Sequence, residues 1–335
     1  MNSTQNDTSA IAPSKDLAFV FPGQGSQAVG MLVELAAQHA LIRETFDEAS
    51  EGASRDLWKL AQEGPQEALD QTENTQPALL AAGVAVWRLW CEQGGAMPSR
   101  LAGHSLGEYA ALVAARVLSL TDAANLVVER GRLMQSAVPA GVGAMAAILG
   151  GDDEQIAQVC SDVAEGQVVA PANYNAPGQL VIAGHSEAVQ RAIDALAEIG
   201  VRKAVKLPVS VPSHCSLMRE AADKLSVRMA DIQWNEPQIP VIQNADADVH
   251  TSIAHIRAAL ERQLYMPVRW CKTVESMGRS GVTRVAECGP GKVLCGLLRR
   301  IDKQIDTRAI GTPEVFEKTL ADWPAEQKPS KAEKA

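Results

Sequence analysis

The stretch LAGHSLGEYAALV, residues 101–113, holds Ser105 between two glycines, Gly103 and Gly107. A weak strand pattern precedes the serine, and a helical pattern follows it over residues 106–115. A G-x-S-x-G segment between a strand and a helix is typical of the nucleophile elbow, a sharp turn that exposes the serine hydroxyl. The helix N-terminus beyond the turn favours developing negative charge. The stretch therefore predicts an α/β sheet with Ser105 as a nucleophile, and the alternative is a serine that only caps the helix.

A second GHS segment in the chain offers an internal comparison. Gly184, His185 and Ser186 follow a strand pattern, but Ala188 stands where the second glycine would be. Without that glycine no sharp turn is expected. Ser186 is therefore predicted to be an ordinary helix N-cap.

The order of patterns along the chain predicts two kinds of sheet. Strand and helix patterns between residues 144 and 207 follow the order β-α-β-β-α-β, which is typical of a ferredoxin-like α+β unit. On either side, helices and buried strands alternate, which favours an α/β core of mostly parallel strands. The expected division is a catalytic subdomain of residues 15–137 and 210–312, a ferredoxin-like subdomain of residues 138–209, and disordered ends at residues 1–14 and 324–335.

Composition and charge disfavour several classes of protein. The net charge is −9, whereas binding to nucleic-acid phosphates needs a basic surface. The longest apolar run, residues 79–90, is short and contains Arg88, so no membrane span is expected. Six scattered cysteines without a Cys-x-x-Cys pair, and an N-terminus without an apolar signal segment, favour a cytoplasmic protein with reduced thiols. No cluster of metal ligands occurs in the sequence, so neither a metal nor a tightly bound cofactor is expected.

A serine nucleophile needs a base, and histidine is the usual one. Of the six histidines, His214 lies in a loop that Pro208 and Pro212 stiffen, where the chain returns from the small insertion. Such a loop can hold an imidazole over Ser105. His104 is adjacent to the serine, but neighbours at a tight turn point apart, so packing is expected of it. The residues alone leave open whether His214 is the base.

Stabilising an oxyanion needs two backbone N–H donors, and the residue after the nucleophile usually supplies one of them. Here that residue is Leu106. The glycine-rich turn FPGQGSQ, residues 21–27, follows the first buried strand and is a source for the second donor. The alternative for this turn is a phosphate-binding loop, but the segment lacks the G-x-x-x-x-G-K-[ST] pattern.

Further motifs follow one another along residues 16–310. They are FPGQGSQ (21–27), GHSLGEYAALV (103–113), Arg130-Gly131 with Met134, NYNAPGQ (173–179), PSH (212–214), QLYMPVRW (263–270) and ECGPGKVL (287–294). Together they resemble the motifs of the malonyl-CoA:acyl carrier protein transacylase family. The resemblance implies an α/β-hydrolase-like core with a ferredoxin-like insertion. It also implies transfer of malonyl from malonyl-CoA to the phosphopantetheine thiol of acyl carrier protein, through a malonyl-serine, in support of fatty-acid synthesis.

The resemblance implies catalytic roles for Ser105, His214 and Gln263. Ser105 attacks the malonyl thioester, and His214 takes its proton. The backbone N–H groups of Gln24 and Leu106 hold the oxyanion. A backbone carbonyl in the Gln263 region orients His214, and no carboxylate is needed because one acceptor on Nδ1–H fixes the tautomer.

The resemblance also implies that Arg130 selects malonyl. A guanidinium grips a carboxylate bidentately, and when it is buried without a partner it penalises uncharged acyl groups. By position alone, a helix-surface arginine is the simpler interpretation of Arg130. The further candidates for the substrate pocket are Met134, Asn173 and Asn175.

The implied partners are malonyl-CoA and acyl carrier protein, with neither nucleic acid nor membrane. Carrier proteins are acidic, so basic residues near the pocket mouth are expected to steer docking. The candidates are Arg202, Lys203, Lys206, Arg299 and Arg300. The alternatives are a trans-acting malonyl acyltransferase of a polyketide synthase, a serine thioesterase or hydrolase, and a catalytically idle carrier-binding protein. A hydrolase has no need of Arg130, and an idle protein would have a damaged site.

Overall fold

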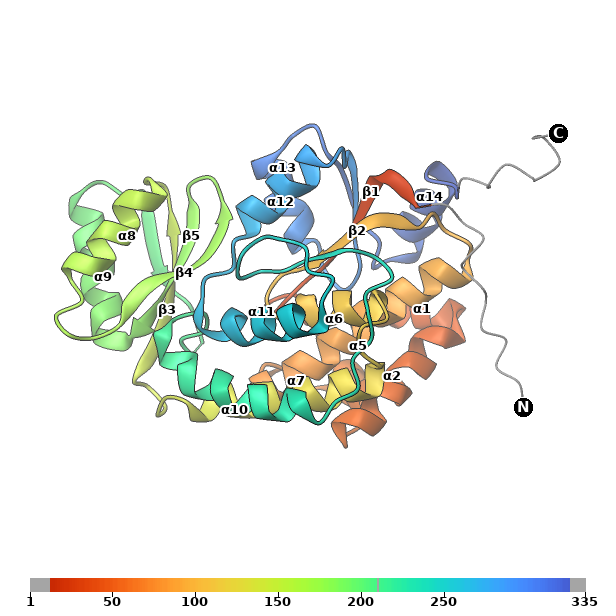
Figure 1. Cartoon of the computed structure of the whole chain (residues 1–335), viewed down its shortest axis with the longest axis horizontal. Helices are drawn as coiled ribbons and strands as arrows, with labels where there is room; N and C mark the ends of the chain where they lie inside the picture. The colour runs from red at the N-terminus through yellow and green to blue at the C-terminus, as the bar shows by residue number, and fades with distance from the viewer. Residues whose placement is uncertain (1–12, 210, 326–335) are drawn as a thin grey trace.

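The computed structural model describes residues 13–209 and 211–325, which form two sheets with their own helices (Figure 1). The sheet of the larger part has five strands, and that of the smaller part has four. The smaller part, at the left of the view, comes from the middle of the chain, so it is an insertion into the larger one. The predicted α/β class with an inserted α+β unit is confirmed.

The larger sheet is wholly parallel, in the order β7-β2-β1-β8-β9. The bounds of its strands are β1 Ser14–Phe21, β2 Pro98–Gly103, β7 Val241–Ile242, β8 Arg284–Glu287 and β9 Asp306–Ala309. The central β1 is buried on both faces, which explains its unbroken apolar run LAFVF. Phe21 pairs with Gly103 at the carboxyl ends of β1 and β2. The turns that follow these two strands therefore lie at the same edge of the sheet.

Helices cover both faces of this sheet. They are α1 Val33–Gln38, α2 Ala40–Ala53, α3 Leu57–Glu63, α4 Gln66–Leu69, α5 Thr72–Glu92, α6 Gly107–Ala114, α7 Leu120–Ser136, α10 Arg219–Ala230, α11 Ile253–Tyr265, α12 Trp270–Arg279, α13 Val293–Ile301 and α14 Pro313–Asp322. The long apolar α5 packs on β1, where Phe19 meets Trp87 and Trp90 edge-on at centroid distances of 5.3 and 5.2 Å. In the part of the chain that the structure describes, no helix combines the length and apolar character needed to cross a membrane.

The smaller sheet is antiparallel, in the order β4-β5-β3-β6. Its elements are β3 Gly143–Leu149, α8 Asp153–Asp162, β4 Val169–Ala176, β5 Gln179–His185, α9 Ser186–Glu198 and β6 Lys203–Lys206. Apolar residues of α8, α9 and the sheet form a separate core, including Ile148, Ile156 and Leu196. The predicted β-α-β-β-α-β order is confirmed, whereas the subdomain boundaries at residues 137/138 and 209/210 stay a prediction.

The two sheets are joined through β4. Tyr174 N donates to Val268 O at 2.9 Å, and Val268 N donates to Ala172 O at 2.9 Å. These bonds lock an edge strand of the smaller sheet to the segment that precedes α12. β4 is thereby held against the larger part of the molecule.

Several local predictions need correction. The sequence also predicts a helix that starts at Thr121 and Asp122, with Thr121 as its cap. In the structure Ser119 caps α7, because its Oγ accepts from Asp122 N at 3.0 Å. Ser186 is the first residue of α9 and not its N-cap; that position is His185, which makes no side-chain capping bond. The short β9 has no counterpart in the sequence prediction.

The ends of the chain were predicted to be disordered over residues 1–14 and 324–335. Residues 1–12 and 326–335 lie outside the described residues. Ser14 begins β1 and pairs with Pro98, and Pro324 forms an isolated bridge with Gly95.

Gly107→Ala is expected to lower the free energy of unfolding by about 3 kcal/mol, because its added methyl group meets rigid backbone. A Cβ at this position would lie 2.0 Å from the carbonyl oxygen of Phe21. Gly296→Ala, inside α13, is the matched control. No atom lies within 4 Å of its added Cβ, so it should be neutral or stabilising by up to about 1 kcal/mol. Urea unfolding, monitored by circular dichroism, measures the stability of both variants. Equal unfolding midpoints for Gly107→Ala and Gly296→Ala would contradict the expected clash at Gly107.

Candidate active site

Ser105 stands at the turn between β2 and α6, at the carboxyl edge of the larger sheet. Its φ is +52°, in the left-handed region that residues other than glycine rarely adopt. The turn is tight, since a Cβ on Gly103 would lie 1.9 Å from the carbonyl carbon of Gly107. Asn244 clamps it: Oδ1 accepts from Ser105 N at 2.6 Å, and Nδ2 donates to Gly103 O at 2.6 Å. The sequence thus folds here into a strained junction that presents the serine hydroxyl to a pocket.

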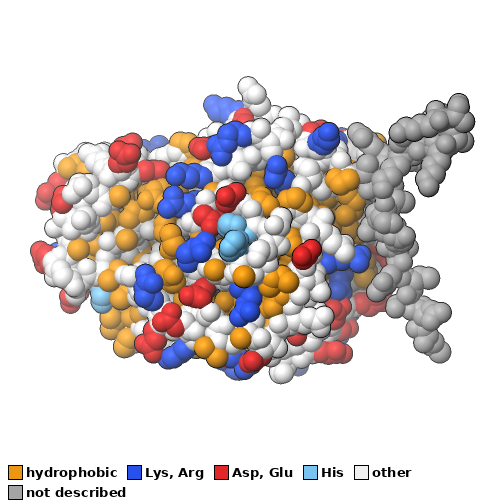
Figure 2. All heavy atoms as spheres, viewed as in Figure 1, with side chains coloured by type: hydrophobic (Ala, Val, Ile, Leu, Met, Phe, Trp, Pro, Cys, Tyr) orange, Lys and Arg blue, Asp and Glu red, His pale blue; other side chains and the backbone are white. Residues whose placement is uncertain are grey.

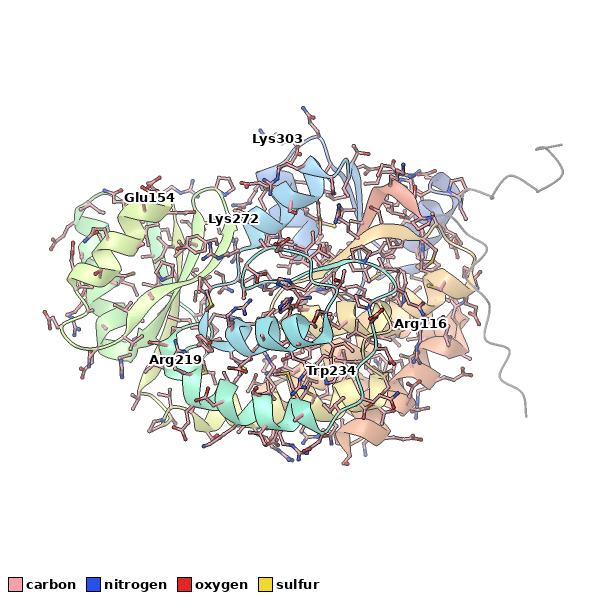
Figure 3. The ribbon with its side chains drawn as sticks, in the orientation of Figure 1. Arg116, Glu154, Arg219, Trp234, Lys272 and Lys303 are labelled. Carbon is pink, nitrogen blue, oxygen red and sulfur yellow. The ribbon has the colours of Figure 1, made fainter. Side chains whose placement is uncertain are left out.

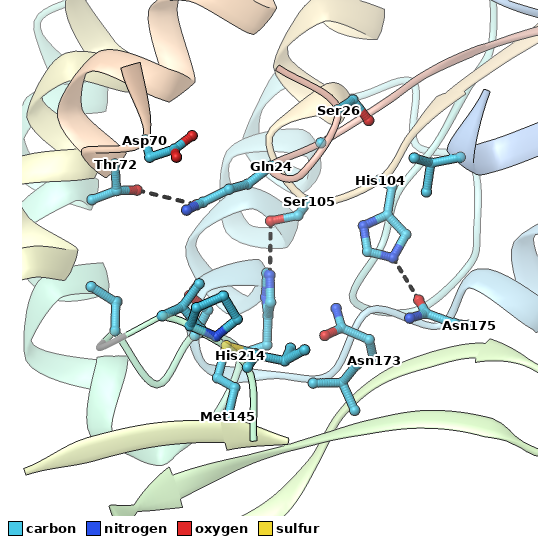
Figure 4. Close-up of a pocket in the computed structure, with 18 of the residues that line it drawn as sticks. Gln24, Ser26, Asp70, Thr72, His104, Ser105, Met145, Asn173, Asn175 and His214 are labelled. Carbon is cyan, nitrogen blue, oxygen red and sulfur yellow. Dashed lines mark hydrogen bonds between the residues drawn. The ribbon is translucent and has the colours of Figure 1, made fainter. Parts of the chain in front are cut away.

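His214 faces the serine across this pocket (Figure 4). Its Nε2 lies 2.8 Å from Ser105 Oγ, and its Nδ1 lies 2.7 Å from the backbone carbonyl oxygen of Gln263. A carbonyl can only accept, so Nδ1 carries the proton and Nε2 is free to receive one. Burial, and to a lesser degree the positive charge of Arg130, lower the pKa of His214 to about 3. The imidazole is therefore neutral near pH 7, the state that a general base requires.

Arg130 brings a buried cation to the same hydroxyl. It projects from α7 and is 1% exposed. Its Nη2 donates to Gln263 Oε1 at 2.9 Å and lies 3.3 Å from Ser105 Oγ, while Nη1 donates to Gln76 Oε1 at 2.7 Å. The guanidinium also lies over the ring of Tyr109, 5.5 Å from its centroid. This position excludes a helix-surface arginine.

The acceptors around Arg130 are neutral. Among the described residues, no carboxylate lies within ion-pair distance of its guanidinium, and its Nε has no hydrogen-bond partner. Burial lowers the pKa of Arg130, although a guanidinium keeps its proton at neutral pH. A buried cation without a counter-ion, beside a hydroxyl in a pocket, is suited to bind an anionic group.

The turn after β1 flanks the serine on its other side. Gly23 packs so closely that a Cβ there would lie 2.5 Å from His104 O, and His104 N donates to Phe21 O at 3.0 Å. Within residues 13–209 and 211–325, the backbone N–H groups of Gln24 and Leu106 donate to no protein acceptor. Two unpaired donors beside the elbow are the requirement for an oxyanion site.

The pocket has a volume of about 460 Å³ and lies between the two sheets. It is lined from the larger part by Ser105, His214 and α13, and from the smaller part by Met145 and the β4 asparagines, Asn173 and Asn175. The side chain of Asn175 is held by His104, whose Nε2 lies 2.8 Å from Asn175 Oδ1, as Figure 4 shows.

Met134 is not among the residues that line this pocket. It is buried behind Gln76, whose Nε2 lies 3.7 Å from the Met134 sulfur. Met134 therefore supports the Gln76 side chain that holds Arg130.

The predicted docking residues lie outside the pocket and fall into two groups. Arg202, Lys203 and Lys206 are exposed on or beside β6, the edge strand that leads to the pocket-lining loop, with Lys206 Nζ 2.9 Å from Ser186 Oγ. Arg299 is bonded to Thr307 on β9, whereas Arg300, on the exposed side of α13, donates to Gln179 at the start of β5. On the face in Figure 2, basic and acidic side chains are mixed.

Two contacts brace the loop that carries His214. Arg219, labelled in Figure 3, lies at the start of α10. Its guanidinium lies over the ring of Tyr265, 4.0 Å from the ring centroid, and this contact ties α10 to α11. His214 N donates to Leu264 O at 3.0 Å, so the base is anchored to the end of the same helix.

Three further polar residues that contact the site were not predicted from the sequence: Glu108, Asn244 and Gln76. Glu108 was visible as a charged residue in an otherwise apolar helix pattern, and Asn244 as a polar residue just after a short strand. Each is buried. No group of three or more potential metal-ligating side chains was found among the described residues.

The fold and the site together define an α/β protein with a serine–histidine pair at a strand–turn–helix junction and a buried arginine beside it. The profile of the acyl transferase domain family matches residues 18–308. The chain is 55% identical to the malonyl CoA-acyl carrier protein transacylase of Salmonella typhimurium, over 90% of this chain and 98% of the relative. It is 45% identical to the protein of that name from Bacillus subtilis, over 90% and 95% of the two chains.

Solved structures give the same result. A malonyl-CoA:acyl carrier protein transacylase from Xanthomonas oryzae matches with a TM-score of 0.93 and 61% identity, over 93% of this chain and all of the other. A malonyl-transacylase in complex with its type II PKS acyl-carrier protein matches with a TM-score of 0.91 and 51% identity, over 92% and 99% of the chains. This chain belongs to the malonyl CoA-acyl carrier protein transacylase family.

Proposed function

We propose that this protein transfers malonyl from malonyl-CoA to the phosphopantetheine thiol of acyl carrier protein, through a malonyl ester on Ser105. One observation carries the proposal: the Ser105 hydroxyl lies 2.8 Å from a neutral imidazole and 3.3 Å from a buried guanidinium. The first contact suits acyl transfer, and the second suits an acyl group that ends in a carboxylate.

In the first half-reaction, Ser105 Oγ gives its proton to His214 Nε2 and attacks the thioester carbon. The N–H groups of Gln24 and Leu106 receive the oxyanion, which needs no reorganisation because both donors are already free. The C–S bond then breaks, and His214 returns its proton to the CoA thiolate. The Gln263 carbonyl stabilises the transient imidazolium through Nδ1–H.

The second half-reaction reverses these roles. The carrier thiol gives its proton to His214, and the sulfur attacks the ester carbon of malonyl-Ser105. Collapse of the oxyanion breaks the bond to Oγ, which takes the proton back. Because one pocket serves both thiols, the thiols enter in turn, as in a ping-pong mechanism.

Arg130 grips the malonyl carboxylate and sets the acyl selectivity. With neutral acceptors alone around it, the guanidinium gains a counter-ion only when malonyl is bound. An acetyl group on Ser105 has no carboxylate and would leave this cation unpaired. Asn173 and Asn175 offer amide groups along the pocket wall for the thioester arm, and Met134 acts from behind through Gln76.

Carrier docking is proposed on the basic residues beside the pocket mouth. Arg202, Lys203 and Lys206 precede the loop that lines the pocket, and Arg300 lies near the end of α13, whose first turns also line it. Arg299 is a weaker candidate, because two of its guanidinium nitrogens are committed to Thr307. The protein is proposed to work in the cytoplasm, with CoA thioester as substrate and no tightly bound cofactor.

A carrier of polyketide synthesis is the second candidate partner. The relative solved with a type II PKS acyl-carrier protein favours it, and the active site would be the same for either carrier. A thioesterase or hydrolase is disfavoured, because hydrolysis does not require a buried guanidinium that binds an acyl carboxylate beside the serine.

Intact-protein mass spectrometry tests the proposal. After brief incubation with malonyl-CoA or acetyl-CoA, malonyl should form an adduct in preference to acetyl, and added phosphopantetheinylated carrier should then remove it. Free malonate without an adduct would indicate a hydrolase, and no reaction at all would leave a carrier-binding protein. Equal transfer to fatty-acid and polyketide carriers would show that the carrier class is not selected at this site.

A further inference from the structure

Glu108 is a buried carboxyl group that the reaction steps above do not use. It lies in the first turn of α6, directly after Gly107, and is 0% exposed. Its Oε2 accepts two hydrogen bonds, from Asn244 N at 2.9 Å and from Gln263 Nε2 at 2.9 Å. Its Oε1 has no partner among the described residues. One oxygen of one side chain thus ties α6 to α11 and to the segment after β7.

Both donors to Glu108 also contact the reacting groups. Asn244 Oδ1 accepts from Ser105 N at 2.6 Å. Gln263 Nε2 donates to Ser105 O at 2.9 Å, and Gln263 Oε1 accepts from Arg130 Nη2 at 2.9 Å. A single residue therefore connects Glu108 to each of the two groups: Asn244 connects it to the nucleophile Ser105, and Gln263 connects it to the guanidinium of Arg130.

The orientation of the Gln263 amide decides whether Arg130 is held. An amide has a donor end and an acceptor end of nearly the same shape. Glu108 Oε2 and Ser105 O are both acceptors at one end, so the amide must turn its NH₂ toward them. The oxygen then faces Arg130. A reversed amide would set donors against the donors of the guanidinium and release it from its place beside Ser105.

We propose that Glu108 is a positioning residue for acyl selectivity: it fixes the orientation of the Gln263 amide, and through this amide it holds Arg130 beside Ser105. The inference rests on the proposed function, in which Arg130 binds the malonyl carboxylate. The essential property of Glu108 is an acceptor oxygen at the end of a side chain of glutamate length.

Ionisation is not the essential property. Burial raises the pKa of Glu108 to about 7, so the group is not a permanent anion near neutral pH. A proton on the unpartnered Oε1 leaves Oε2 able to accept both bonds. The orientation of Gln263 therefore does not require a charge at this position.

Two conservative variants separate acceptor geometry from charge. Glu108→Gln keeps the length and can place its amide oxygen at the Oε2 position, where Asn244 N requires an acceptor. Glu108→Asp keeps the acid group but shortens the side chain, so its oxygen cannot reach both donors. The readout is the ratio of malonyl to acetyl acylation rates of Ser105, from intact-protein mass spectrometry on a quench-flow time scale.

The Glu108→Gln variant is expected to keep the wild-type ratio within about threefold, even if its melting temperature falls. Glu108→Asp is expected to lower the ratio about tenfold or more, through loss of malonyl acylation, a size usual for coupled neighbours. A merely structural role would lower both acylation rates together and leave the ratio unchanged, which would overturn the proposal. A loss of the malonyl preference in Glu108→Gln would also overturn the proposal. If Glu108→Asp does not fold, the ratio of malonyl to acetyl acylation in Glu108→Gln is the test.

The wild-type protein separates failure of this inference from failure of the proposed function. If the wild type forms no malonyl adduct, the proposed function fails. If it prefers malonyl and Glu108→Asp keeps that preference, only the positioning role of Glu108 fails.

Discussion

Ser105→Ala is expected to form no malonyl adduct and to lose malonyl transfer by about 10⁴-fold or more, since removing a nucleophile abolishes the covalent pathway. In the structure, Ser105 Oγ is the hydroxyl that lies on His214 Nε2. The fold should survive, because the clamp on the turn binds the backbone N and O of Ser105 and not its hydroxyl. Intact-protein mass after incubation with malonyl-CoA shows whether an adduct forms, and the melting temperature shows whether the fold survives.

The chain supplies its own control for this variant. Ser186 belongs to the second GHS segment, but it lies in the first turn of α9, and its hydroxyl contacts Lys206 at the surface. Ser186→Ala should form the malonyl adduct as the wild type does. An adduct that persists in Ser105→Ala would place the nucleophile elsewhere, and an adduct lost in Ser186→Ala would undermine the distinction between the two turns.

Patterns local in the sequence predicted the framework of the site. The apolar run of β1, the glycine-flanked serine and the alternation in the inserted unit each depend on neighbouring residues, and the structure has the expected strand–turn–helix junction between Gly103 and Gly107. The same patterns did not predict correctly where helices begin. Ser119 and Thr121 are both good caps by type, and only the backbone bond to Asp122 decides between them.

Contacts between distant residues could not be read from local patterns. His214 was one of six histidines, and its position over Ser105 depends on how the loop after the insertion is anchored to α11, where His214 N donates to Leu264 O. The environment of Arg130 depends on the packing of α7 against α5, from which Gln76 reaches the guanidinium. The motif resemblance named both residues, but the physical cause of their properties, burial with neutral partners, lies in the tertiary structure.

The sequence position of Glu108 suggests a different role from the one that the structure shows. An acidic residue in the first turn of a helix is ordinarily explained by the helix dipole and by exposure to solvent. In α6 the neighbouring residues are almost all apolar and buried, so this helix has no solvent face for a carboxylate. The number of polar partners that such a residue needs was predictable, but their identities, Asn244 and Gln263, were not.

Arg130→Ala is expected to lower malonyl acylation of Ser105 by about 10²-fold, the size of a lost charge-assisted bidentate contact. Acetyl acylation should fall far less or rise, because the variant has no unpaired cation to leave buried beneath an uncharged acyl group. The ratio of the two rates, measured by intact-protein mass spectrometry, is therefore the informative quantity. An unchanged ratio would contradict the role of Arg130 in binding the carboxylate.

Two further variants on the same helix sharpen this result. Arg130→Lys keeps the positive charge but cannot span Gln76 Oε1 and Gln263 Oε1 while it also presents two parallel donors to a carboxylate, so the malonyl preference should stay well below that of the wild type. Arg132→Ala removes an arginine that is largely exposed and paired with Glu73, and it should leave the ratio unchanged. If lysine restored the full preference, charge alone would select malonyl. If Arg130→Ala and Arg132→Ala, each made singly, had the same ratio of malonyl to acetyl acylation rates, selectivity would arise from the general electrostatic field of the protein. It would then not depend on the guanidinium beside Ser105.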